Sequence, residues 1–115
     1  MQHRNKIALQ KILEIIKETL EIFEDTSLEN FLNNRERQLA MTMLILRIGE
    51  LVKNLTMEFR EKNSQVKWKP IAGFRDIIAH KYDIVDMKEV YSTIKKDFPE
   101  LKMQIEKILE SDMEE

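Results

Sequence analysis

The chain has 115 residues, which is the length of one domain. It contains no cysteine, which excludes a disulfide framework and thiolate metal sites. The lack of cysteine also fits a reducing cytoplasm. Its net charge of −2 is not that of a typical nucleic-acid-binding protein. No uninterrupted apolar stretch reaches the roughly 20 residues that a membrane span needs, and the N-terminus is charged and amphipathic. We therefore expect a soluble, cytoplasmic, all-α protein without a signal peptide, since two glycines and two prolines stand against many strong helix formers.

The first third of the chain predicts one long helix and one short helix. Apolar residues recur at helical spacing over about residues 4–24, with lysines and glutamates between them. Thr26, followed three residues later by Glu29, predicts an N-terminal cap for a short helix that ends near Leu32.

The longest helix is predicted over about residues 35–62. Its middle, from Leu39 to Val52, is apolar almost all the way round, so it needs cover on more than one side. A second copy of the chain would supply this cover, and we predict a homodimer. Gly49 would let a neighbouring helix approach closely. Glu50 would need a partner, and a structural ion pair is favoured over a catalytic role.

Three more helices complete the prediction. Pro70 suits the first turn of a helix that runs to about residue 80. Asp86 with Glu89 predicts the start of the next helix, and Asp97 with Glu100 predicts the start of the last. Residues 111–115 are predicted to be a frayed tail. The fold class is thus an antiparallel bundle of four to five main helices, in a single domain over residues 1–115.

Most of the plausible chemistry falls between Ile71 and Tyr82, where the sequence reads Arg75, four residues, His80, one residue, Tyr82. At 100° per residue, Arg75 and His80 lie about 140° apart on one helix and flank a strip of small residues. Two such side chains point too far apart to hold one small target. A second copy of the helix facing the first across a two-fold axis would bring each arginine towards the other chain's histidine.

The segment from Arg60 to Lys81 is the basic part of an acidic chain, with six basic and two acidic side chains. A cluster in sequence need not be a cluster in space, and both readings stay open.

Three blocks of sequence together resemble the HepT family of prokaryotic HEPN-domain toxins over nearly the whole chain. The blocks are Ile48-Gly49-Glu50, then Trp68 to Tyr82, then Asp97-Phe98-Pro99-Glu100-Leu101. The resemblance implies a HEPN-type bundle that dimerises through the long helix and the motif helix. It also implies a metal-independent ribonuclease site at the dimer interface, with no cofactor.

Carried over by position, the resemblance makes Arg75 and His80 the catalytic residues. Tyr82 would be the tyrosine to which a partner, a minimal nucleotidyltransferase antitoxin, transfers AMP to silence the toxin. The position after the arginine is commonly Asn in this family, and here it is Asp76. Asp76 could orient His80 or repel the phosphate, and we treat it as a supporting residue. Three lysines near the motif are candidate RNA contacts: Lys67, Lys69 and Lys81.

The chemistry suits these residue types. RNA carries its own nucleophile, the 2′-hydroxyl, so a protein needs only to move protons and stabilise the charge that develops at phosphorus. Histidine can do the first and arginine the second, without a metal.

Other readings remain open at this point. Arg75 could simply pair with a carboxylate, His80 could cap its helix, and Tyr82 could lie at the edge of the core. As a whole, the chain could be a non-catalytic binding subunit of a nucleotidyltransferase complex, or a purely structural helical dimer.

Overall fold

The computed structural model describes residues 1–114, and every regular element in that range is helical. In chain order the elements are α1 (His3–Phe23), α2 (Leu28–Leu32), α3 (Arg35–Lys53), α4 (Met57–Lys62), α5 (Trp68–His80), a 3-10 turn (Tyr82–Ile84), α6 (Met87–Ser92), a π turn (Thr93–Asp97) and α7 (Phe98–Glu114). The predicted all-α class is therefore confirmed. None of these helices is both long and apolar enough to cross a bilayer.

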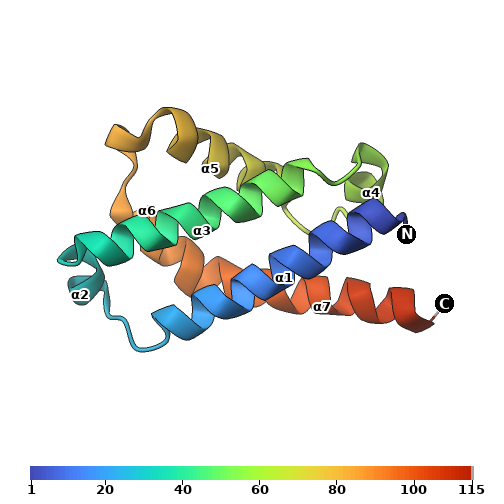
Figure 1. Ribbon diagram of the computed structural model, residues 1–115, viewed down its shortest axis with the longest axis horizontal. Helices are drawn as coiled ribbons and strands as arrows, with labels where there is room; N and C mark the ends of the chain where they lie inside the picture. Colours follow the sequence, from blue (N-terminus) through green and yellow to red (C-terminus); the bar gives the residue numbers. More distant parts are fainter. Residues whose placement is uncertain (115) are drawn as a thin grey trace.

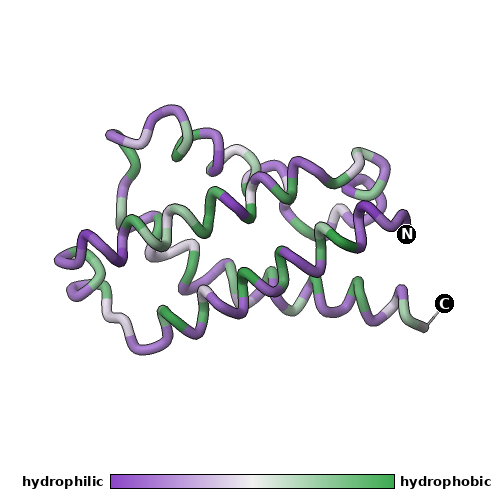
Figure 2. Tube along the Cα trace, viewed as in Figure 1, coloured by the Kyte–Doolittle hydropathy of each residue, from purple (hydrophilic) through white to green (hydrophobic). Residues whose placement is uncertain are grey.

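The body of the bundle consists of α1, α3 and α7. In Figure 1, α1 runs antiparallel to both α3 and α7, and α5 packs on the side of α3 away from α1. Hydrophobic and hydrophilic residues alternate along these helices with the period of a helix that has one buried face (Figure 2). The most deeply buried side chains come from α1, α3, the π turn and α7, and they include Leu9, Ile12, Ile16, Met41, Ile48, Val52, Ile94 and Ile105.

The short helix α2 is capped one residue later than predicted. Ser27 is the N-cap, and its hydroxyl accepts a hydrogen bond from the Asn30 amide at 3.1 Å. Thr26 is buried instead, where its hydroxyl accepts from Nη1 of Arg37. Both residue types can cap a helix, and the tertiary contact with Arg37 decides between them.

The predicted helix over residues 35–62 is in fact two helices, because the chain breaks after Lys53. Thr56 caps α4, and its hydroxyl accepts from the Phe59 amide at 3.2 Å. The buried side chain of Asn5 fixes this joint: its Oδ1 accepts from the Thr56 amide at 3.0 Å and its Nδ2 donates to the Thr56 hydroxyl at 3.1 Å. A residue 51 positions away therefore sets the break.

The C-terminal part is one continuous helical run from Met87 to Glu114. Asp86 caps α6 as predicted, with its carboxylate accepting from the Lys88 amide. Asp97 does not start a new helix, because it ends a π turn that leads directly into α7. A wider turn is suited to this place, since Pro99 has no amide hydrogen to donate to the preceding turn.

The predicted frayed tail is helical over residues 111–114, and Glu115 lies outside the described residues. Asp112 is held against α1, where its carboxylate lies 3.4 Å from Nζ of Lys6.

Candidate functional site

Gly49 brings α5 against α3 at the position of Arg75. A Cβ at residue 49 would overlap the Cβ and Cγ of Arg75, and it would lie 3.4 Å from the carbonyl oxygen of Ile71. The prediction that Gly49 permits a close helix approach is confirmed. This contact fixes the Cβ and Cγ of Arg75, which belongs to α5, against the backbone of α3.

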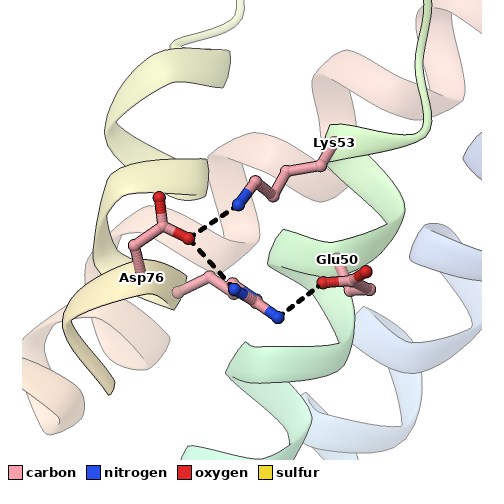
Figure 3. A network of polar contacts seen from close by, with 4 residues as sticks. Glu50, Lys53 and Asp76 are labelled. Atoms are coloured by element: carbon pink, nitrogen blue, oxygen red, sulfur yellow. Dashed lines mark hydrogen bonds and ion pairs between the residues drawn. The ribbon is translucent and has the colours of Figure 1, made fainter. Parts of the chain in front are cut away.

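Four charged side chains from α3 and α5 form one network (Figure 3). Arg75 Nη2 lies 2.8 Å from Glu50 Oε2, and Arg75 Nη1 lies 3.1 Å from Asp76 Oδ1. The same oxygen of Asp76 accepts a hydrogen bond from Lys53 Nζ at 2.7 Å. Glu50 thus has the ion-pair partner that the sequence suggested, although its side chain is 57% exposed rather than buried.

Arg75 is the least exposed member of this network, with 23% of its side chain accessible. Its Nε is buried and has no hydrogen-bond partner among the described residues. The two terminal nitrogens each bind a carboxylate, and each carries a second N–H that could donate to another acceptor. The guanidinium is therefore oriented by α3. It is positioned to bind an anion, which would either displace one of these carboxylates or share the guanidinium with it.

Asp76 does not orient His80 in this structure. Its described polar partners are Lys53 and Arg75. Hydrogen bonds hold the pKa of Asp76 below its ordinary value of 3.8. The bond from Lys53 has the largest effect and the bond from Arg75 the second largest. Two helical residues four apart can meet, but here the hydrogen bonds of the Asp76 carboxylate go to Lys53 and Arg75 instead.

His80 is the last residue of α5 and is exposed. It lies five positions after Arg75, a rise of about 7.5 Å along the helix. The described residues show no hydrogen bond between the two side chains. A single chain therefore presents the predicted catalytic pair as two separate groups, about 140° apart around one helix.

Tyr82 is not on the helix with Arg75, because α5 ends at His80 and Lys81 turns the backbone to φ −138°. Tyr82 therefore does not share a face of α5 with Arg75. The Tyr82 ring lies under the guanidinium of Arg35, 5.4 Å from the ring centre, and its hydroxyl is buried without a partner among residues 1–114.

The three candidate RNA-contacting lysines are exposed but do not form one patch. Lys67 and Lys69 lie at the start of α5, and Lys81 lies beyond its end. The helix separates the two groups by about 20 Å. The described residues contain no group of three or more His, Cys, Asp and Glu side chains suited to hold a metal ion.

Two residues near this site were not found by sequence reasoning. Lys53 follows Glu50 by three residues, so both point to the same side of α3, and this spacing was a usable signal. Arg35 gave no signal, because only the fold brings it to Tyr82.

The fold and the site define a class of protein: a small all-α bundle that presents an oriented arginine and an exposed histidine on one helix. Comparison with known proteins places it further. Residues 12–108 match the family described as "Ribonuclease HepT-like", and the chain belongs to that family.

Curated relatives agree with this assignment. The chain is 43% identical over 105 residues to "Gamma-glutamylcyclotransferase and putative RNase MJ0434" of Methanocaldococcus jannaschii, covering 91% of this chain but only 47% of that protein. It is 39% identical to "Putative RNase TTE0752" of Caldanaerobacter subterraneus subsp. tengcongensis, over 90% of this chain and 93% of the relative. It is 32% identical to "Probable ribonuclease HepT" of Thermococcus cleftensis, over 94% and 98%. No solved structure matches significantly. A ribonuclease is thus the enzyme class that family and relatives indicate.

Proposed function

We propose that this protein is the toxin of a toxin–antitoxin pair, a metal-independent endoribonuclease that acts in the cytoplasm. The observation that carries the proposal is the orientation of Arg75 by Gly49 and Glu50 on a helix that also exposes His80. Arginine is permanently charged and binds phosphate oxygens through parallel donors, and histidine can transfer protons near neutral pH.

In the proposed reaction, the 2′-hydroxyl of RNA attacks the adjacent phosphorus and the 5′-oxygen of the next nucleotide leaves. His80 transfers a proton in this step, and Arg75 stabilises the negative charge that develops on the phosphate oxygens. The products are a 2′,3′-cyclic phosphate end and a 5′-hydroxyl end. The lysines at both ends of α5 would contact the RNA backbone on either side of the cleaved bond.

A homodimer through α3 and α5 would complete this site. Large apolar side chains are exposed on both helices: Leu39 and Met43 on α3 are 46% and 57% exposed, and Ile77 on α5 is 45% exposed. A second copy of the chain could cover them. A two-fold axis near α5 would place Arg75 of one protomer close to His80 of the other. Light scattering on the purified protein measures the mass, and a stable monomer at micromolar concentration would contradict the composite site.

The decisive experiment is RNA cleavage in the presence of EDTA. Purified protein should cut RNA and leave 2′,3′-cyclic phosphate ends, whereas Arg75→Ala and His80→Ala should each lose at least about 100-fold in rate. Circular dichroism of both variants checks that they fold. Cleavage that needs Mg²⁺, or that survives in both variants, would contradict the mechanism.

Regulation is proposed through a minimal nucleotidyltransferase partner that transfers AMP to Tyr82. The Tyr82 hydroxyl is buried, so it must become accessible before it can accept AMP, and we expect the ring to leave its contact with Arg35 as residues 81–85 move. The added phosphate would then hold the loop in an altered position next to the C-terminal end of α5.

A second candidate is a non-catalytic binding subunit of the nucleotidyltransferase complex. The engagement of Arg75 by two carboxylates favours it, because such a guanidinium is partly neutralised. It predicts binding of the nucleotidyltransferase without any Arg75-dependent RNA cleavage.

A further inference from the structure

Lys53 is a charged residue of the network to which no role has been assigned. Its Nζ lies 2.7 Å from Asp76 Oδ1, and that same oxygen lies 3.1 Å from Nη1 of Arg75. Figure 3 shows Lys53 on α3 reaching across to Asp76 on α5, one turn along α3 from Glu50. Lys53 therefore touches Arg75's partner rather than Arg75 itself.

The charge balance of the network depends on Lys53. Arg75 faces two carboxylates, those of Glu50 and Asp76, and these three groups alone carry a net charge of −1. Lys53 brings the network to zero. A phosphate that approaches Arg75 is repelled by a net negative cluster, and it meets much less resistance at a neutral one.

Lys53 also fixes where the Asp76 carboxylate lies. Asp76 Oδ1 accepts from both the Lys53 ammonium and the Arg75 guanidinium, so its negative charge is shared between two donors. A carboxylate oxygen shared in this way holds the guanidinium less tightly than an oxygen that accepts from the guanidinium alone. Without Lys53, Asp76 would turn fully to Arg75 and compete with phosphate for Nη1.

We propose that Lys53 is a positioning residue for RNA binding: it anchors and neutralises Asp76, so that Arg75 can exchange this carboxylate for a phosphate of RNA. The inference rests on the proposed ribonuclease function. It assigns to α3 a part in substrate binding beyond the packing of α5.

A purely structural ion pair is the competing explanation. Lys53 and Asp76 are 40% and 46% exposed, and a pair at such exposure stabilises a fold only weakly. Lys102 and Glu106 on α7 form a comparable pair, 3.5 Å long and 35% and 36% exposed, away from the site. Lys102→Met is therefore a matched control for the loss of one exposed paired lysine.

The test measures KM and kcat for a fluorescent single-stranded RNA of mixed sequence, for the wild type, Lys53→Met, Lys53→Arg, Lys53→Met with Asp76→Asn, and Lys102→Met. Lys53→Met should raise KM about three- to tenfold at low salt with little change in kcat, because an uncompensated charge repels the phosphate. The increase should shrink in high salt. The double variant and Lys53→Arg should both return KM towards the wild-type value, and Lys102→Met should leave it unchanged.

Each other outcome has a definite meaning. An unchanged KM in Lys53→Met, in a wild type that cleaves RNA, overturns the inference and leaves the proposed function standing. A double variant as weak as Lys53→Met also overturns it, because Lys53 would then contact RNA directly. A wild type that neither binds nor cleaves RNA overturns the proposed function and the inference together.

Discussion

Gly49 on α3 lies directly against the Cβ of Arg75 on α5, and no larger residue fits between the two helices at this point. Position 49 therefore controls both the packing of α5 and the orientation of Arg75. The neighbouring residue, Glu50, pairs with the guanidinium of Arg75 beside this contact.

Gly49→Ala should destabilise the protein. The added methyl group must push α5 away from α3, and such overpacking costs about 1–3 kcal/mol. Over most of that range the cost is larger than the roughly 0.5–1 kcal/mol that Ala gains over Gly inside a helix. Gly73 in α5 is the control, because a Cβ there meets nothing within 4 Å, so Gly73→Ala should be neutral or stabilising. Urea unfolding measures both. Equal shifts in the two variants would contradict the close contact at Gly49.

The pKa of Asp76 should respond to Lys53. The hydrogen bond from Lys53 is the largest cause of the lowered pKa, so Lys53→Met should raise it towards 3.8, whereas Lys102→Met should not. Since folding lowers this pKa, the contribution of Asp76 to stability is complete above the unfolded pKa near 3.8 and is lost as the pH falls through the lower folded value. NMR titration of the Asp76 carboxyl carbon checks the shift. A pKa unaffected by Lys53→Met would show that the pair does not persist in solution.

Tyr82→Phe should leave stability unchanged or raise it by up to about 1 kcal/mol, because the hydroxyl that it removes is buried without a hydrogen-bond partner among the described residues. Tyr91→Phe is the matched control, since the Tyr91 hydroxyl donates to the carbonyl of Thr26 at 3.0 Å, and its loss should cost about 1 kcal/mol. Thermal unfolding compares the two.

Asn5→Ala should destabilise the protein by about 1–3 kcal/mol, because it leaves the Thr56 amide at the start of α4 without its partner. Asn33→Ala removes an exposed amide that donates to the Glu29 carbonyl, and it should change stability by less than about 0.5 kcal/mol. Amide hydrogen exchange should show the loss of protection concentrated at the first turn of α4. An Asn5 variant as stable as the Asn33 variant would contradict the role of this joint.

The sequence predicts the features of this fold that depend on local pattern. The apolar periodicity of α1 and α3, the Asp86 cap and the close approach at Gly49 all follow from nearby residues. Features that depend on distant residues were missed. The break after Lys53 depends on Asn5, and Thr26 loses the capping position to Ser27 because Arg37 binds it.

The candidate site follows the same division. The motif positions of Arg75 and His80 could be read from the sequence, and the carboxylate partner of Arg75 could be guessed from Glu50. The direction of the Asp76 side chain could not, because it depends on Lys53 from another helix. The contact of Tyr82 with Arg35 could not be predicted either, because it joins residues 47 positions apart that only the fold brings together.

The π turn at Thr93–Asp97 sets the rotational phase between α6 and α7. An α-helix advances 100° per residue, so apolar residues repeated every four positions drift gradually around its axis. Val90, Ile94 and Phe98 are spaced in this way, yet all three are buried together with Leu101. The wide turn absorbs the drift, so one helical run can face α2 at its start and α1 further on (Figure 1). A π turn holds one residue more than an α-helical turn, so deleting one residue within Thr93–Asp97 should restore regular α-helix with α7 still facing the bundle. The same deletion inside α7 would instead rotate every later side chain by about 100°.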